Sequence, residues 1–193
     1  MLLRYVDTIT LTSSAGAARI SGSQYEFRLN SIYDTDKTST GHQPYMYDQV
    51  ATLYGKYRVD RCDVQVDAIV SPSTSHAITA LVQGPSGGLN LGGQELNFLL
   101  ENVKAKTLYA LTTAVNPPRI RFSIDIAKYL GIGRDAYEAD LTQFAASVGA
   151  NPSAICMLNL VTSAFAGTSE SIQAVVTLVY HVKFWDPITF GQS

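Results

Sequence analysis

Two carboxylates in a polar loop are the residues whose spacing best suits a chemical role. Asp34 and Asp36 form an Asp-x-Asp pair, and alternate side chains of an extended loop can face one hard cation such as Ca²⁺. Two ligands are too few for a complete site, so we expect a divalent cation only if a neighbouring subunit supplies further ligands. The alternative is a solvated turn in which these Asp side chains accept hydrogen bonds from nearby backbone N–H groups.

The remaining candidates for catalysis are isolated. His42, His76 and His181 lie far apart along the chain, so it contains neither an H-x-H pair nor an H-E-x-x-H motif for a metal. The glycine-rich stretch 84–93 lacks the Lys-Ser/Thr ending of a phosphate-binding loop, and 131–133 is only a fragment of a dinucleotide fingerprint. We therefore expect a protein that is not an enzyme and that has no cofactor other than the cation considered above.

Composition limits the class of protein. The 193 residues fit one β-sandwich domain, residues 1–193. Charged residues make up 16% of the chain, against about 25% in typical soluble domains. This low charge fits a surface largely covered by other subunits, and it equally fits a secreted or lectin-like domain with a neutral polar surface. Cys62 and Cys156 lie in apolar runs and are expected to be buried thiols. No apolar run is long enough for a membrane helix and no signal peptide is visible, so we expect no membrane association.

Strand patterns dominate the chain. Period-2 alternation, β-branched runs and turn clusters predict eight strands, over residues 2–12, 24–30, 57–70, 75–84, 105–113, 119–127, 153–166 and 171–185. Without a βαβ rhythm the sheets should be antiparallel, and eight such strands predict an all-β jelly-roll sandwich of two four-stranded sheets. The last two strands, joined by a short turn, are expected to form a hairpin.

One or two short helices are expected in the loops. Helical spacing over residues 47–54, followed by Gly55, predicts one short helix. Residues 94–103 are expected to form a helical turn, and 129–149 a loop with some helix around 136–146.

Four segments carry a family resemblance: FRLNSIYD (27–34), GHQPYMYDQ (41–49), LYGKYRV (53–59) and VYHVKFWDP (179–187). The first three resemble the capsid proteins of small circular single-stranded DNA viruses that encode a Rep protein, the CRESS-DNA group. They are also similar to the shell domains of tombusvirus-like and nodavirus-like viruses. The fourth is similar to the last jelly-roll strand of that group. The resemblance thus covers nearly the whole chain.

The resemblance implies a viral structural protein of the virion, made inside the host cell. It would self-assemble into an icosahedral shell, with about 60 copies in the simplest (T=1) case, and the shell would enclose a single-stranded genome. The loop 30–49 is long, polar and aromatic, so we predict that Pro44, Tyr45 and Tyr47 contact a neighbouring subunit. The alternative is that Tyr45 and Tyr47 only cap the end of the sandwich.

The basic residues depart from the family pattern. Such capsid proteins usually begin with an Arg/Lys-rich arm, whereas this sequence has a net charge of -2 and no cluster of basic residues. Either an arm outside this sequence holds the genome, which we favour, or scattered residues do so: Arg4, Arg19, Arg119 and Arg121. The host receptor and the choice of DNA or RNA are not determined by the sequence.

A second class of function is a carbohydrate-binding jelly-roll module. Such a module would present an exposed Trp or Tyr beside Asp and Asn on a concave face. Trp185 is the only tryptophan and lies in an apolar strand, which weakens this alternative.

Overall fold

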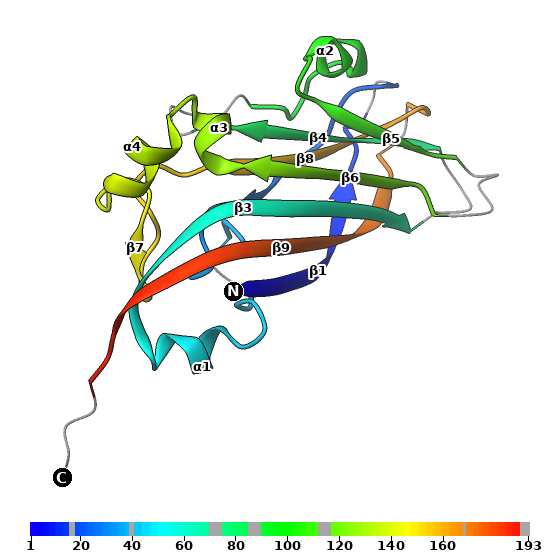
Figure 1. The fold of residues 1–193 in the computed structure, drawn as a ribbon. Helices are drawn as coiled ribbons and strands as arrows, with labels where there is room; N and C mark the ends of the chain where they lie inside the picture. Colours follow the sequence, from blue (N-terminus) through cyan, green and yellow to red (C-terminus); the bar gives the residue numbers. More distant parts are fainter. Residues whose placement is uncertain are drawn as a thin grey trace.

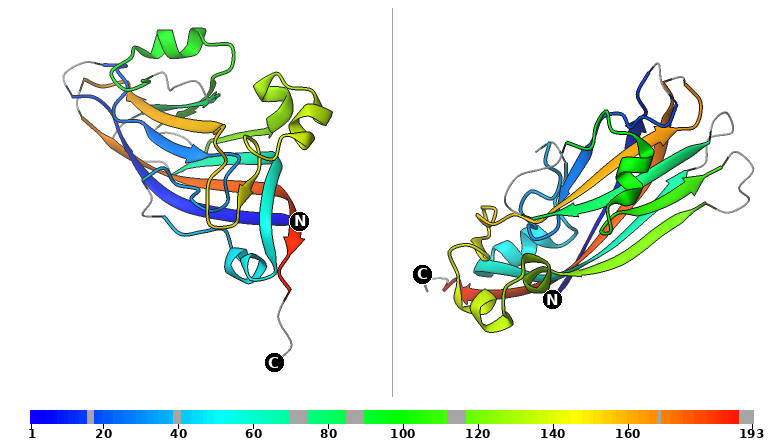
Figure 2. Two further views of the ribbon diagram at one scale, coloured as in Figure 1. Left: turned by 90° about the vertical axis from the view of Figure 1, so that its left-hand side faces the viewer. Right: turned by 90° about the horizontal axis from the view of Figure 1, so that it is seen from above.

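The computed structural model describes residues 1–15, 18–38, 41–69, 75–84, 90–111, 117–167 and 169–189. Over these residues the chain forms two antiparallel β-sheets that pack face to face, with short helices outside the sheets (Figure 1). The two layers can be followed in the turned views of Figure 2. None of the described helices is long and apolar enough to cross a membrane.

The first sheet contains the longest strands. Its order is β1–β9–β3–β6, and a two-residue strand, β7, pairs with the beginning of β3. β9 lies inside the sheet because it pairs with β1 on one side and with β3 on the other. The five strands are Leu2–Thr12 (β1), Ser171–Pro187 (β9), Tyr54–Ile69 (β3), Arg119–Asp125 (β6) and Ala146–Ser147 (β7).

The second sheet has the order β2–β8–β4–β5, again with antiparallel neighbours. The chain crosses from one sheet to the other at most of its connections, which is how a jelly roll is wound. Its four strands are Tyr25–Arg28 (β2), Met157–Ala164 (β8), His76–Gln83 (β4) and Lys106–Ala110 (β5).

Alternation along the strands builds one core between the sheets. Leu3 and Tyr5 of β1 are buried in it, whereas Arg4 between them is exposed. Ile78 and Leu158 reach the same core from the second sheet. A smaller cluster of Leu81, Leu91, Leu99 and Val161 lies outside this core. Leu81 and Val161 alternate with core residues of β4 and β8, so the segment 90–105 covers the outer side of the second sheet.

The strand predictions are confirmed for all eight main strands, and β1 has the predicted bounds. The prediction of two four-stranded sheets missed β7, which gives the first sheet a fifth strand. The predicted hairpin of the last two strands is wrong, because β8 pairs with β2 and β4 while β9 pairs with β1 and β3. A short connection can close a hairpin or cross between two layers, so its length alone does not distinguish the two.

The predicted number of helices, one or two, was too low, since the described residues contain four short helices. Two of them lie near the segments 47–54 and 94–103, where helix was expected. A third overlaps only the beginning of the helix expected around 136–146, and the helix over 126–130 was not expected. The helix that begins at Tyr47 ends at Ala51, and Gly55 is already part of β3, so Gly55 does not stop the helix. The four helices are Tyr47–Ala51 (α1), Leu96–Glu101 (α2), Ile126–Leu130 (α3) and Arg134–Ala139 (α4).

Candidate functional site

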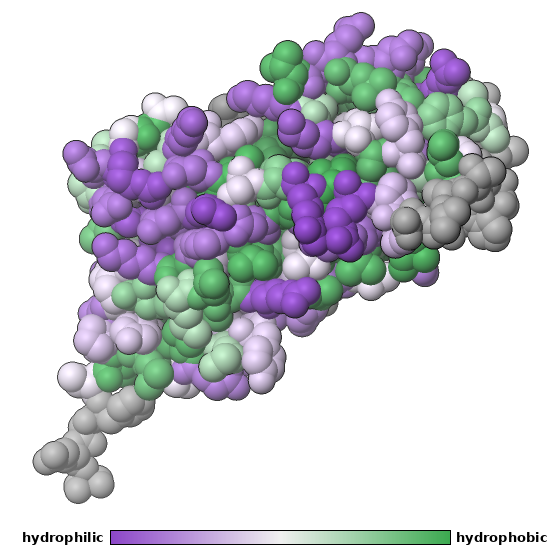
Figure 3. Space-filling model, turned by 45° about the vertical axis from the view of Figure 1, so that its right-hand side comes forward, coloured by the Kyte–Doolittle hydropathy of each residue, from purple (hydrophilic) through white to green (hydrophobic). Residues whose placement is uncertain are grey.

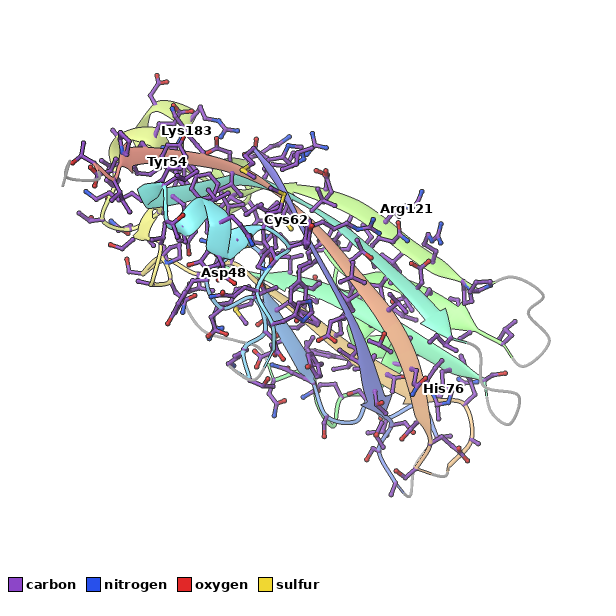
Figure 4. All side chains as sticks on the ribbon, turned by 90° about the horizontal axis from the view of Figure 1, so that it is seen from below. Asp48, Tyr54, Cys62, His76, Arg121 and Lys183 are labelled. Atoms are coloured by element: carbon purple, nitrogen blue, oxygen red, sulfur yellow. The ribbon has the colours of Figure 1, made fainter. Side chains whose placement is uncertain are left out.

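Three of the four predicted arginines share the outer face of the first sheet. The register places Val6, Thr177, Gln65 and Arg121 in one row across β1, β9, β3 and β6. Neighbouring rows hold Arg4 and Arg119, which are both exposed. Arg121 points away from the sandwich (Figure 4). The structure therefore groups these three guanidinium groups on one surface.

Carboxylates on the same face neutralise part of this charge. Arg119 forms an ion pair with Asp67, and Asp63 accepts hydrogen bonds from Arg61 (2.9 Å) and pairs with His181 (2.8 Å). Partial burial raises the pKa of Asp63, but hydrogen bonds from Ser123, His181 and Arg61 outweigh it and hold the pKa below its ordinary value. Asp63 is thus a fixed negative charge on this face.

The outer face of the first sheet therefore carries both positive and negative charges. Arg121 donates to the side chain of Gln65 (2.8 Å), and among the described residues neither Arg4 nor Arg121 has a carboxylate partner. A shallow groove of about 420 Å³ runs beside Arg121, with Thr177 and Val179 among its lining residues. Its lining also includes Asp63, so it lacks the concentrated positive charge that a phosphate backbone requires.

Arg19 lies elsewhere, beside the second sheet. Its backbone N–H donates to the carbonyl of Ala164 (2.7 Å), and its guanidinium lies over the ring of Phe165, 5.9 Å from the centroid. The Phe165 ring in turn contacts Tyr109. Arg19 is therefore not part of the surface that carries the other three arginines.

The two loop carboxylates each have partners within the chain. Asp34 forms an ion pair with Arg28 (2.7 Å). Asp36 is buried and accepts hydrogen bonds from the Tyr25 hydroxyl (2.9 Å) and from the backbone N–H (2.9 Å) and hydroxyl (2.6 Å) of Thr38. The described part of the chain contains no group of three or more His, Cys, Asp or Glu residues that could hold a metal. A cation here would need ligands from another subunit, and that prediction stays untested.

The predicted contact residues of the 30–49 loop differ in exposure. Tyr45 is 81% exposed, as a contact residue should be. Pro44 and Tyr47 are buried within the subunit, and Tyr47 belongs to the main core. Their side chains already pack inside the chain, so their burial does not favour a direct contact, and the prediction for these two residues stays untested. The alternative that Tyr47 caps the sandwich end fits its burial better.

Sequence reasoning missed several exposed apolar residues. Met46 directly follows Tyr45, and Leu53 lies between α1 and β3. Phe98 and Leu100 lie on α2, and Val103 follows it. The signal was present in α2, whose sequence Leu-Asn-Phe-Leu-Leu-Glu is apolar on more than one side. Figure 3 shows apolar and hydrophilic side chains reaching the surface side by side.

Potential nucleophiles do not form a site. Cys62 and Cys156 are free and buried, as expected, and burial raises the pKa of Cys156 to about 12, so its thiol stays protonated and unreactive. Residues 84–88, Gly-Pro-Ser-Gly-Gly, fit the spacing of the hydrolase motif G-x-S-x-G. That motif works on a turn from a strand into a helix. Gly84 instead follows β4, a strand inside an antiparallel sheet, and 85–89 lie outside the described residues.

Comparison with known proteins places the fold among virus shells. No protein-family model and no curated protein matches the sequence. Solved structures do match: a semi-empty virus-like particle of the nodavirus of the prawn Macrobrachium rosenbergii aligns with 12% identity and a TM-score of 0.54, over 100% of this chain and 96% of that chain.

Two further structures agree with this match. The Kashmir bee virus virion at acidic pH has 9% identity and a TM-score of 0.54, over 97% of this chain and 74% of that chain. The Mud Crab Dicistrovirus structure has 10% identity and a TM-score of 0.52, over 98% of this chain and 73% of that chain. The predicted fold is thereby confirmed: this chain has the jelly-roll sandwich that these virus particle proteins share.

Proposed function

We propose that this chain is the shell-forming capsid protein of a small icosahedral virus, with a structural and not an enzymatic role. The observation that carries the proposal is the full-length match of its jelly roll to the subunit of a nodavirus-like particle, with almost nothing left over on either side. The described chain lacks an inserted projecting domain, so residues 1–193 would serve as one shell domain with loops of the jelly roll on the outside. Its place would be the virion.

The finer part of the proposal concerns the particle. A closed shell of identical subunits needs about 60 copies in the simplest case, and T=1 remains a prediction. So does membership of the CRESS-DNA group, which rests on the segments 27–34, 41–49 and 53–59.

For the genome, we propose that most of the contact belongs to a basic arm outside this sequence. The arginines of the first sheet support only a weak contribution, because Asp63 and Asp67 share their face. Replacing Arg4 and Arg121 with Gln should lower the amount of packaged nucleic acid slightly without affecting particle formation. Loss of most of the nucleic acid in these particles would instead make this face the main genome contact.

The proposed Ca²⁺ between subunits can be tested by removing it. If Asp34 contributes to an intersubunit cation site, EDTA should lower the dissociation temperature of the particles, and Asp34→Asn particles should show no further response to EDTA. Wild-type particles that melt at the same temperature with and without EDTA would rule out the cation.

The proposal as a whole is tested by negative-stain electron microscopy of the purified chain, together with its 260/280 nm absorbance ratio. Uniform round particles are expected, and a high ratio would show enclosed nucleic acid. A monomer at all concentrations, pH values and salt concentrations would contradict the proposal. Selective binding to a glycan array by that monomer would favour the carbohydrate-binding alternative, for which half-buried Trp185 gives little support.

A further inference from the structure

A polar cavity lies near the beginning of α2, where three segments of the chain meet. Its lining residues come from 12–14 at the end of β1, 21–24 before β2 and 90–93 before α2, and its volume is about 530 Å³. Figures 1 and 2 show the chain after β1 reaching the side of the sandwich that carries α2. We name this cavity the serine pocket, because four of its lining residues are serines.

The walls of the serine pocket are fastened to one another by the fold. The N–H of Gly93 donates to the carbonyl of Ser21 (2.9 Å), and the N–H of Leu91 donates to the side-chain oxygen of Gln24 (3.0 Å). The third segment is in direct contact with these two, since a Cβ on Gly22 would stand 1.6 Å from the carbonyl oxygen of the last residue of β1. The pocket therefore exists before any ligand binds, which lowers the entropic cost of binding.

The hydroxyl groups of the serine pocket fall into two kinds. The hydroxyl of Ser21 is buried and accepts the N–H of Gln94 (2.9 Å), so it belongs to the wall. Within the described part of the chain, by contrast, the hydroxyls of Ser14 and Ser23 have no hydrogen-bond partner, and Ser23 is exposed. Two hydroxyls of the pocket are thus left to bind a ligand.

The two carboxamides of the serine pocket divide their groups in the same way. The side-chain oxygen of Asn90 accepts the N–H of Gly92 (3.0 Å), as that of Gln24 accepts a backbone N–H, so both oxygens stabilise the wall. Neither amide nitrogen has a partner among the described residues. The free groups of the pocket are therefore two amide donors and two hydroxyls, each of which can donate and accept.

The chemistry of the lining excludes most classes of ligand. Among the described residues that line the serine pocket, none is charged, aromatic or aliphatic. A phosphate, a carboxylate or a metal cation would find no group of opposite charge there, and an apolar ligand would find no apolar side chain. A peptide is normally held by an open strand edge or an apolar groove, and the pocket offers neither. What remains is a neutral ligand that is rich in hydrogen-bonding groups.

We infer that the serine pocket binds a neutral saccharide. The hydroxyls of a sugar ring both donate and accept, as the free hydroxyls of Ser14 and Ser23 do, and they can accept from the amides of Gln24 and Asn90. The cavity volume also lies within the range of about 300–1,000 Å³ that is usual for small-molecule sites. This inference goes beyond the proposed function, because a single copy of the chain contains the whole site. On a particle of about 60 copies, many weak sites would act together on a glycan-coated surface.

Saturation-transfer NMR tests the class of ligand. The probes are the methyl glycosides of glucose, galactose, mannose and N-acetylglucosamine, with glucuronic acid and N-acetylneuraminic acid as charged sugars. At least one methyl glycoside should receive saturation from the protein, and the charged sugars should receive none. If none of the neutral probes binds, or if a charged sugar binds as well as the best of them, the inference is wrong.

Variants of the pocket test the place of binding. Ser23→Ala removes a hydroxyl that has no partner in the described chain, so it should leave the fold intact and weaken binding of the best probe about five-fold, as expected for one neutral hydrogen bond. Asn90→Asp keeps the acceptor for the N–H of Gly92 but replaces the amide donor with a charge, and it should weaken binding further. Asn97→Asp adds the same charge at an exposed position of α2 outside the pocket and should bind as the wild type does. Unchanged binding in the double variant Ser23→Ala, Asn90→Asp would overturn the site.

Binding and assembly are separate readouts of the same purified chain. Particles that bind none of the neutral probes would overturn the saccharide site and leave the proposed function intact. A chain that binds a methyl glycoside through the serine pocket but forms no particles would support the site and bring down the proposed function, in favour of the carbohydrate-binding module.

Discussion

His76 is a histidine buried without a good partner. It lies at the beginning of β4 with no exposed surface, its Nδ1 is 3.4 Å from the hydroxyl of Thr162, and its Nε2 has no hydrogen-bond partner among the described atoms. Burial lowers the pKa of His76 below its ordinary value, although the charge of Glu170 acts in the opposite direction. The folded chain therefore holds this imidazole neutral under conditions in which the unfolded chain begins to protonate it.

The pH dependence of stability follows from that difference. Below the ordinary histidine pKa of about 6.5, the unfolded chain binds a proton at His76 that the folded chain does not bind. The free energy of unfolding therefore falls as the pH falls, by up to about 1.4 kcal/mol per pH unit. The fall ends when the pH reaches the lower pKa of the folded state. Urea unfolding at a series of pH values should show this slope in the wild type and a flatter one in His76→Gln. The exposed His42→Gln is the control, and an equal slope in His76→Gln would contradict the assignment.

Asn30 ties the loop after β2 to the segment before β8. Its side-chain amide donates to the carbonyl of Ala154 (2.7 Å) and its oxygen accepts from the N–H of Cys156 (2.8 Å), all in a buried setting. Asn30→Ala leaves two buried backbone groups unpaired, so it should lower the free energy of unfolding by about 2–3 kcal/mol. Gln43→Ala, which removes an exposed bond to the carbonyl of Tyr33, should change it by less than about 0.5 kcal/mol. Similar values for both variants in urea unfolding would show that Asn30 has no special role.

The long strands could be predicted from the sequence, because alternation along one strand is a local pattern. Elements that depend on their ends or on contacts with distant residues could not. The alternation of Leu3, Tyr5 and Ile9 with exposed neighbours fixes β1, because one face of that strand is buried and the other is in water. α3 escaped prediction because it is only one turn long and is defined by its ends, where Asp125 accepts the N–H of Lys128 and Gly131 takes a left-handed conformation. Its apolar residues looked like the continuation of β6.

Local sequence patterns are also the reason why the site residues could be predicted only in part. Tyr45 and Tyr47 are alike in sequence, and only the packing of α1 against β3 shows that one is exposed and the other is in the core. Arg4 and Arg121 come together through the pairing of four strands across 117 positions of sequence, which no local pattern reveals.

The turn before α1 allows strain and contact to be separated. Because Met46 is left-handed, Met46→Gly should relieve the strain while Met46→Ala keeps it, so the glycine variant should be more stable than the alanine variant by about 1 kcal/mol. Both variants lose the exposed side chain and should assemble less well than the wild type. Thermal unfolding of the monomer and the assembly concentration measure the two effects. An alanine variant as stable as the glycine variant would show that the turn is not strained.

At the scale of the whole molecule, the proposed shell raises the question of which force would join its copies. Only 16% of the residues are charged, and large apolar side chains are exposed on several elements, whereas carboxylates on the outer face of the first sheet neutralise part of its positive charge. Burial of apolar surface, at about 25 cal/mol per Å² before the entropic cost of association, then dominates over attraction to a polyanion.

Salt distinguishes these forces. Sulfate strengthens apolar burial, whereas NaCl screens charges and weakens phosphate contacts steeply. Assembly of the nucleic-acid-free chain, followed by sedimentation, should therefore shift to lower protein concentration in ammonium sulfate and change little between low and moderate NaCl. Bovine serum albumin in the same buffers controls for general precipitation. If particles of the free chain instead dissociate as NaCl rises, charge pairs between copies, and not burial of apolar surface, hold the particle together.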